Sequence, residues 1–202
     1  MRATSPIATS SSSRLDAWLQ ALVAAPGLTA LDLQGAREAL VEDSLRAVEL
    51  LRGIDGPVVD VGSGGGVPGI PLALALPDSE FVLLEASQRR CAFLETWVPA
   101  NARVVRGRAE EQETDWAGAA LAKALAHPPT AAEWCLPLVA PGGIAVLWAG
   151  ASADADRVAA VAERLGATLA GGPPGLLVLR KLGPTPPGFP RRVGVARKRP
   201  LA

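Results

Sequence analysis

The chain has 202 residues, of which 49% are hydrophobic and 20% charged, so it can bury a full core and is not disordered as a whole. Its 20 basic and 20 acidic residues cancel, which argues against binding of nucleic acid through overall charge alone. No apolar run is long enough to cross a membrane, and the Ser- and Thr-rich start lacks the apolar segment of a secretory signal, so we expect a cytoplasmic protein.

The N-terminal part is expected to form a short helical extension. Residues 1–13 are rich in Ser and Thr and are predicted to be disordered. Apolar residues recur at helical spacing over residues 14–25 and again over about 32–51. We therefore predict two amphipathic helices within residues 14–56, and Pro57 ends this pattern.

Residues 57–183 alternate between strand and helix patterns, which is typical of a doubly wound α/β domain with a mostly parallel sheet covered on both faces. The last two strands are separated only by a Gly- and Pro-rich turn, which predicts an antiparallel pair at the end of the sheet. Strands are predicted at residues 58–61, 81–85, 103–106, 119–124, 144–148, 167–170 and 176–181. Helices are predicted from the glycine-rich loop to Leu76 and at residues 88–98, 131–138 and 154–165.

The last segment, residues 184–202, is rich in Pro and basic. From Arg180 to the end, the chain contains seven Lys or Arg and no Asp or Glu. The rest of the chain therefore has 13 basic residues and all 20 acidic ones. A basic end on a neutral-to-acidic body indicates contact with a polyanion, although a solvated, disordered end has the same composition. Because of its prolines, the tail is predicted to lie over the surface or extend from it without forming helix or sheet.

The segment that carries the chemistry is a strand that ends in a carboxylate and runs into glycines. Residues 60–72 read DVGSGGGVPGIPL. In an open α/β sheet, ligands bind outside the carboxyl ends of the strands, and glycines let the backbone approach a ligand closely. The alternative is a loop that merely turns the chain.

Two kinds of cofactor fit this loop. Residues 64–69 match the dinucleotide pattern G-x-G-x-x-G, which a run of glycines satisfies easily. A dinucleotide loop holds a pyrophosphate, and Asp60 would repel that charge. S-adenosylmethionine instead offers an ammonium and a sulfonium, which a carboxylate attracts, so it is the expected cofactor. Glu85, at the end of the next strand, can accept the ribose hydroxyls of either cofactor.

The whole pattern resembles the RsmG (GidB) family, which methylates guanine N7 in 16S ribosomal RNA, over roughly residues 35–200. The resemblance implies a Rossmann-like S-adenosylmethionine-dependent methyltransferase without a metal, and 16S rRNA or the small ribosomal subunit as partner. It rests on the loop at 60–72 and on four further segments: EASQRR at 85–90, GRAEE at 107–111, AKALA at 122–126 and PPGFPRRVGVARKRPL at 186–201.

Two sets of site residues follow from the loop chemistry and the resemblance. No catalytic residue is expected, because guanine N7 has an exposed lone pair that needs no general base, and the enzyme's task is orientation. The tail is predicted to contact RNA phosphates through Arg191, Arg192, Arg197, Lys198 and Arg199. The cofactor is predicted to contact Asp60, Gly62, Ser63, Gly64, Gly66, Val67, Glu85, Ala86, Ala109, Glu110 and Lys123.

Three departures from the family leave an alternative open. Leu40 stands where the family has His, Lys123 where it has Arg, and Ala149 where it has Lys. These changes lie on the side that should face the substrate, so a divergent relative that acts on another RNA or a small molecule, or that has lost activity, is the alternative. A nicotinamide-dependent oxidoreductase is disfavoured by Asp60.

Other residues able to carry chemistry are interpreted as structural. Cys91 and Cys135 lie in apolar surroundings without metal-like spacing and are predicted to be reduced core residues. His127 has no evident partner and is interpreted as a loop residue. Packing rather than base stacking is expected of Trp97, Trp116, Trp134 and Trp148.

Overall fold

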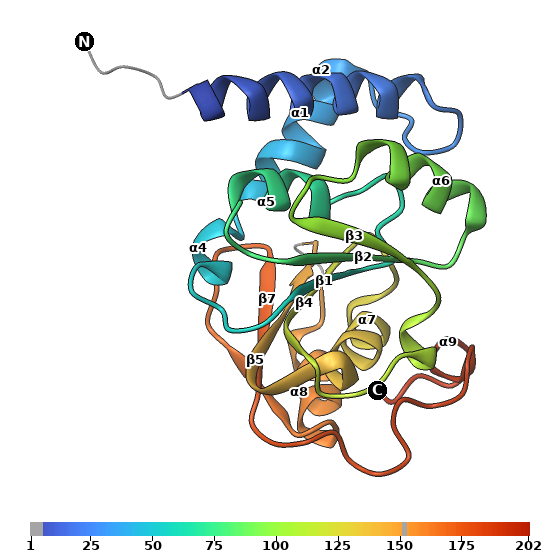
Figure 1. The fold of residues 1–202 in the computed structure, drawn as a ribbon. Coiled ribbons are helices and arrows are strands. Elements are labelled where there is room, and N and C mark those ends of the chain that lie inside the picture. The colour runs from blue at the N-terminus through green and yellow to red at the C-terminus, as the bar shows by residue number, and fades with distance from the viewer. Residues whose placement is uncertain (1–5, 151–152) are drawn as a thin grey trace.

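The centre of the fold is a seven-stranded sheet with the order β3-β2-β1-β4-β5-β7-β6 (Figure 1). The structure is a computed structural model that describes residues 6–150 and 153–202. The strands are β1 (Val58–Val61), β2 (Phe81–Glu85), β3 (Ala102–Arg106), β4 (Ala117–Lys123), β5 (Val139–Trp148), β6 (Ala167–Ala170) and β7 (Leu176–Lys181). The first five in this order pair in parallel, and β7 runs antiparallel between β5 and β6. The doubly wound fold class is confirmed, as is the antiparallel pair at the end.

The strand order reverses between β1 and β4, which places a ligand-binding switch point at the carboxyl ends of these two strands. Asp60 in β1 pairs with Leu83 on one side and Leu121 on the other, so the glycine loop that follows β1 leaves the sheet at its middle. All four residues of β1 are buried, as expected for a central strand covered on both faces.

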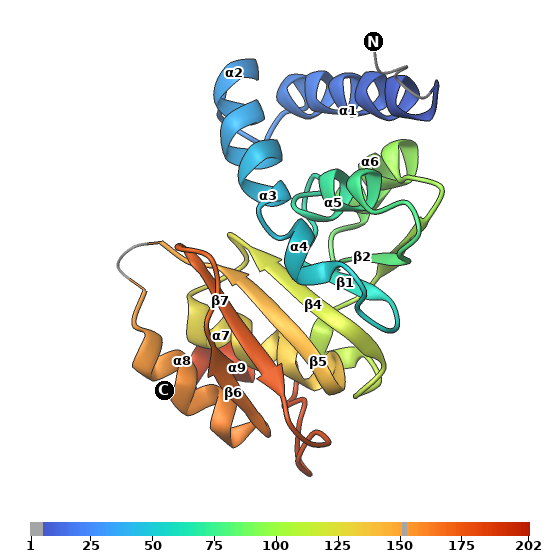
Figure 2. The same ribbon diagram turned by 90° about the vertical axis from the view of Figure 1, so that its left-hand side faces the viewer.

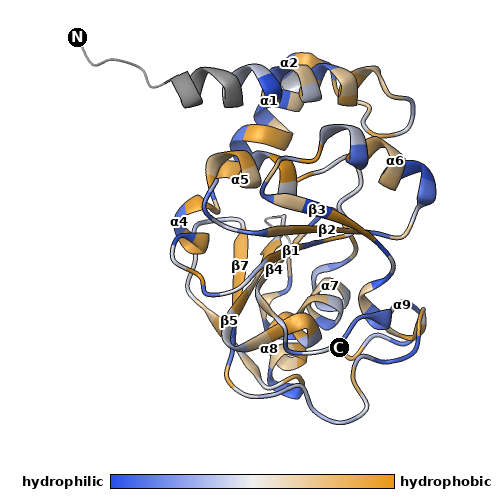
Figure 3. Ribbon diagram, viewed as in Figure 1, coloured by the Kyte–Doolittle hydropathy of each residue, from blue (hydrophilic) through white to orange (hydrophobic). Residues whose placement is uncertain are grey.

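Two layers of helices cover the sheet (Figures 1 and 2). One face packs against α7 (Pro128–Cys135), a 3-10 turn (Leu136–Leu138) and α8 (Ala155–Arg164). The other packs against α5 (Gly69–Ala75), α6 (Gln88–Trp97) and the N-terminal helices. Figure 3 shows hydrophobic residues along the central strands and hydrophilic ones at the outer end of α6. The two cysteines are free and buried, as predicted.

The N-terminal layer differs from the two helices that the sequence predicts. Helix α1 spans Pro6–Ala24, so residues 6–13 are helical and the prediction of disorder there is wrong; residues 1–5 lie outside the described residues. The buried face of α1 nucleates the helix, and each further residue then adds one backbone hydrogen bond. The Ser-rich composition of residues 6–13 gives no sign of this extension. The second predicted helix is divided into α2 (Leu33–Ala36), a π-helical segment (Arg37–Glu42), α3 (Asp43–Leu45) and α4 (Val48–Leu51).

A side-chain hydrogen bond accompanies the π-helical segment. The hydroxyl of Ser44 donates a hydrogen bond to the carbonyl oxygen of Leu40 at 2.5 Å, a side-chain bond that competes with the regular helical pattern. The break redirects the chain so that Asp43 meets the carboxyl ends of β4 and β5, as described below. Across the described residues, every helix is too short or too polar to serve as a membrane span.

The C-terminal tail is folded against the domain. The side chain of Asp115 accepts hydrogen bonds from the Thr185 amide, at 3.0 and 3.1 Å, and from its hydroxyl, at 2.8 Å. The segment then forms a short helix, α9 (Val195–Lys198), in which Ala196 is buried. The prediction that the tail forms no helix is therefore wrong, because the four residues of α9 contain no proline and are held by contacts with distant parts of the chain.

Candidate cofactor and substrate site

The glycine loop between β1 and α5 has the conformation that its sequence predicts. Gly62 and Gly64 have φ angles of +71° and +58°, a region that favours glycine. A Cβ atom on Gly62 would lie 2.3 Å from Cδ1 of Leu125, whereas one on Gly64 would meet no side chain within 4 Å. Gly62 is thus required for packing, and Gly64 leaves an open backbone face that a ligand can approach.

Glu85 at the end of β2 braces this loop. Its side chain is nearly buried, and its carboxylate accepts hydrogen bonds from the amide of Gly64 at 2.9 Å and from the amide of Ser87 at 2.8 Å. Each carboxylate oxygen can accept a second bond. Glu85 therefore holds the loop and can still accept ribose hydroxyls in the cavity that it lines.

Two adjoining cavities lie at this edge of the sheet. The larger, of about 280 Å³, is lined by five of the predicted cofactor residues: Gly62, Glu85, Ala86, Ala109 and Glu110. The smaller, of about 210 Å³, is lined by five as well: Gly62, Ser63, Gly64, Val67 and Lys123. Both are lined by Gly62, Arg90 and Ala124, and together they have the size of a small-molecule site. Gly66 and Asp60 line neither cavity.

Asp60 does not occupy the position that the sequence predicts for direct contact with the cofactor cation. Its carboxylate is fully buried beneath the loop, where Oδ2 accepts the amide of Gly69 at 3.0 Å. Oδ1 has no hydrogen-bond partner among the described residues. Burial, with a smaller contribution from the charge of Glu85, raises the pKa of Asp60 to about 7. A positive charge bound above the loop would favour ionisation of this carboxyl.

We expect the affinity for S-adenosylmethionine to rise between pH 6 and 8. The native pKa of Asp60 lies above the unfolded value of about 4, so the stability associated with its protonated form is present below pH 4 and is lost as the pH rises to about 7. A bound cation offsets that loss, which couples binding to ionisation. Calorimetric titration at pH 6, 7 and 8 should show this trend in wild type and in the exposed control Asp78→Asn, and not in Asp60→Asn. An identical pH dependence in Asp60→Asn would contradict this role.

Trp134 in α7 is a site residue that sequence reasoning missed. Its side chain packs against the core and also lines the larger cavity. The indole Nε1 is buried and has no acceptor among the described residues. An unpaired buried donor is unfavourable, and a ligand with nitrogen or oxygen acceptors, such as the adenosine part of S-adenosylmethionine, would satisfy it. The cavity therefore fits the expected cofactor, and nothing in the sequence separated Trp134 from the other tryptophans.

Trp134→Phe should separate ligand binding from folding. Phe keeps most of the packing and removes the unpaired N–H, so the melting temperature should be unchanged or slightly higher. The dissociation constant for S-adenosylmethionine should rise about tenfold, the equivalent of one lost hydrogen bond of about 1.4 kcal/mol. Thermal unfolding and calorimetric titration measure the two effects. Unchanged affinity would show that the indole N–H does not meet the cofactor.

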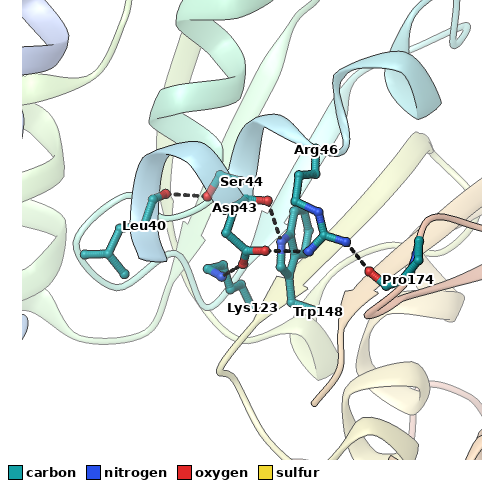
Figure 4. Close-up of polar contacts among 7 residues, drawn as sticks. All are labelled: Leu40, Asp43, Ser44, Arg46, Lys123, Trp148 and Pro174. Carbon is teal, nitrogen blue, oxygen red and sulfur yellow. Dashed lines mark hydrogen bonds and ion pairs between the residues drawn. The ribbon is translucent and has the colours of Figure 1, made fainter. Parts of the chain in front are cut away.

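Lys123 at the end of β4 is held by the N-terminal layer (Figure 4). Its ammonium forms an ion pair with Asp43 and lies 5.7 Å from the ring centre of Trp148. Asp43 also accepts from Arg46 at 2.7 Å, and its backbone carbonyl accepts from the Trp148 indole at 3.1 Å. Burial acts to raise the pKa of Asp43, but the hydrogen bonds and charges of Lys123 and Arg46 hold it below its usual value.

This cluster joins parts of the chain that are far apart in sequence. Arg46 also donates to the carbonyl of Pro174, so Asp43 and Arg46 tie the α3 region to β4, to β5 and to the β6–β7 connection (Figure 4). Leu40, in the family's His position, lines the smaller cavity beside Lys123. Lys123 thus lines the smaller of the two cavities expected to hold the cofactor, but its charge is balanced by Asp43.

The N-terminal layer also supports the glycine loop. The indole N–H of Trp18 in α1 donates to the carbonyl of Gly65 at 3.0 Å, and the Trp18 side chain is fully buried. Leu22, one turn later, lies where a Cβ atom on Gly65 would be. The apolar face of α1 was visible in the sequence, but its contact with the loop was not.

The basic tail reaches the cofactor cavity. The amide of Gly194 donates to Glu110 at 3.2 Å, and Arg197 lines the larger cavity. Arg191 instead binds both carboxylate oxygens of the nearly buried Glu133, at 2.5 and 2.6 Å. The charge of Arg191 is therefore balanced inside the fold, and its predicted contact with RNA stays a prediction. The other four predicted contacts remain exposed: Arg192, Arg197, Lys198 and Arg199.

Residues 14–165 match the family described as rRNA small subunit methyltransferase G (GidB). This chain belongs to that family. Its relative of that name from Synechococcus sp. (strain JA-2-3B'a(2-13)) is 37% identical over 79% of this chain and 72% of its own length. The one from Salinispora arenicola is 50% identical over 54% and 51%. The match begins at residue 14, so the N-terminal helices are part of the family similarity.

Solved structures show the same fold. The Thermus thermophilus 16S rRNA N2 G1207 methyltransferase RsmC, bound to AdoMet and guanosine, has a TM-score of 0.54 at 16% identity, with 73% of this chain and 40% of that chain covered. The antibiotic-resistance methyltransferase Kmr has a TM-score of 0.51 at 18% identity, covering 70% and 91%. The family confirms a methyltransferase with S-adenosylmethionine as cofactor, and the nicotinamide alternative is wrong.

Proposed function

We propose that this protein transfers the methyl group of S-adenosylmethionine to guanine N7 of 16S rRNA in the small ribosomal subunit. The observation that carries the proposal is the double cavity at the β1–β4 switch point, lined by the glycine loop, Glu85 and the Ala109-Glu110 segment, in a chain of this family. A protein with this substrate would act in the cytoplasm.

The chemistry requires positioning more than proton transfer. The cofactor supplies an electrophilic methyl group when bound. Glu85 would accept the ribose hydroxyls, Trp134 would donate to an acceptor of the adenosine part, and the loop from Gly62 to Val67 would enclose the methionine part. Guanine N7 is unprotonated at neutral pH, so orientation of its lone pair toward the methyl group suffices.

The exposed tail residues would position the RNA. Arg192, Lys198 and Arg199 are exposed and have no ion-pair partner in the described part of the chain, and Arg197 stands at the cavity. Such residues bind phosphates without reading sequence, so affinity should fall steeply with salt. Because N7 lies in the deep groove of an RNA duplex, the target is expected in a loop or in an incompletely folded region.

Transfer of labelled methyl to small-subunit RNA tests the proposal. RNA should come from cells that lack the endogenous modification, with large-subunit RNA and transfer RNA as competing acceptors. After digestion to nucleosides, the label should appear as 7-methylguanosine from small-subunit RNA. Label in another nucleoside or acceptor, or none from a protein that binds S-adenosylmethionine, would favour the divergent relative that Leu40 and Ala149 suggest.

A further inference from the structure

A third cleft adjoins the cofactor cavities on the side of α7 and α8. It has a volume of about 660 Å³, and its wall includes Ala124, His127, Thr130, Asp154, Arg157 and Arg197. It shares Ala124 with both cofactor cavities and Arg197 with the larger one. The cleft is therefore a lateral extension of the same site, and Ala124, directly after β4, stands where the three spaces meet.

Thr130 contributes an unused hydroxyl to this cleft. The residue is 6% exposed, and its hydroxyl has no hydrogen-bond partner among the described residues. It lies in the first turn of α7, where the two preceding residues, Pro128 and Pro129, offer no backbone N–H. The hydroxyl is not among the fully buried unpaired atoms, so it is open to the cleft and can donate to a ligand with acceptor atoms.

The charges around the cleft select the ligand. Arg157 projects from the first turn of α8 and Arg197 from α9, and neither has an ion-pair partner within the described residues. Asp154 also faces the cleft, but its Oδ1 accepts the amide of Arg157 at 3.1 Å and caps α8. Two guanidinium groups thus line the cleft, beside the capping carboxylate of Asp154 and the chain end at Ala202. Guanidinium and hydroxyl groups together suit the oxygens of a phosphate.

We propose that this cleft binds a phosphate of the RNA strand next to the target guanine. The inference rests on the proposed function and assigns Thr130 and Arg157 as RNA-positioning residues together with Arg197. A phosphate held there would place the attached nucleotide beside Ala124, where the cleft opens to the cofactor cavities. The volume is sufficient for a nucleotide. Such a contact fixes the register of the strand and leaves the choice of base to other groups.

The test compares Arg157→Ala and Thr130→Val with Arg103→Ala. Arg103 lies on the edge strand β3, outside this cleft, and is an exposed control with the same loss of charge. RNA affinity is measured by fluorescence anisotropy over a range of salt, and KM and kcat by methyl transfer. For Arg157→Ala we expect about a tenfold higher KM for RNA and a salt slope lower by about one unit. Thr130→Val should raise KM about fivefold, and S-adenosylmethionine affinity should be unchanged in all three variants.

The outcomes separate this proposal from the proposed function. Normal methylation by Arg157→Ala and Thr130→Val, with KM and salt slope equal to those of Arg103→Ala, would overturn the cleft alone. Absence of methyl transfer by wild type would refute the proposed function, and a reduced salt slope of RNA binding in Arg157→Ala would still support the cleft. Calorimetric titration with inorganic phosphate is a further arm. Tight phosphate binding without any effect on RNA would overturn the proposal in favour of a free anion.

Discussion

Arg191→Ala should destabilise the protein by about 3–5 kcal/mol, because it leaves the carboxylate of Glu133 buried without a partner. Glu133 is 3% exposed in α7 and receives two hydrogen bonds from the guanidinium of Arg191. Arg191 also donates to the carbonyl of Arg199 at 2.9 Å, so its loss would loosen the end of the tail. For a domain of this size, the melting temperature should fall by roughly 10 °C, measured by circular dichroism.

Arg192→Ala is the matched control, since the neighbouring side chain is exposed. It should change stability by less than about 0.5 kcal/mol while weakening RNA binding at low salt. Adding Glu133→Gln to Arg191→Ala should recover part of the loss, because the buried group is then neutral. Equal melting temperatures for Arg191→Ala and Arg192→Ala would show that the ion pair does not hold the tail.

Glu85→Gln should weaken S-adenosylmethionine binding about 100-fold, which corresponds to about 3 kcal/mol. The carboxylate accepts the amides of Gly64 and Ser87, and an amide side chain has only one oxygen for these two donors. The loop would lose its brace and the ribose hydroxyls would lose a charged acceptor. At saturating cofactor, kcat should remain within about threefold of wild type, because no proton transfer is required of this residue.

The exposed Glu113→Gln serves as the control and should change neither quantity. Calorimetric titration gives the affinity, and methyl transfer at saturating cofactor gives kcat. A large fall in kcat with unchanged cofactor affinity would contradict a mechanism based on positioning and would give Glu85 a chemical role.

The sheet was largely predictable because its signals are local. Apolar runs bounded by Gly, Pro or charged residues gave the ends of β1, β2, β6 and β7 as the structure has them. The break between α2 and α4 was not predictable, because contacts such as the hydrogen bond of the Ser44 hydroxyl to the Leu40 carbonyl leave no signal in the apolar pattern. Periodicity alone continues a helix through such a point.

The site was predictable where it follows the backbone path from one strand end to the next. Glu85 is the last residue of β2 and the Ala109-Glu110 segment comes shortly after β3, so both lie at the carboxyl ends of strands, where they line the larger cavity. Contacts between distant segments had no local signal: the Asp43–Lys123 pair and the Arg191–Glu133 pair each join residues more than 50 positions apart. The basic composition of the tail predicted an RNA contact for Arg191. Composition could not show that this residue has a nearly buried partner, Glu133.

The most direct test of the central claim is to map 7-methylguanosine in the RNA product. Small-subunit RNA from cells lacking this modification is incubated with the protein and S-adenosylmethionine, reduced, cleaved with aniline and read by primer extension. We expect cleavage at one guanine in wild type, the same guanine at lower yield in Arg157→Ala, and none without cofactor. Absence of cleavage in the presence of a stable, cofactor-binding protein would contradict guanine-N7 transfer to 16S rRNA.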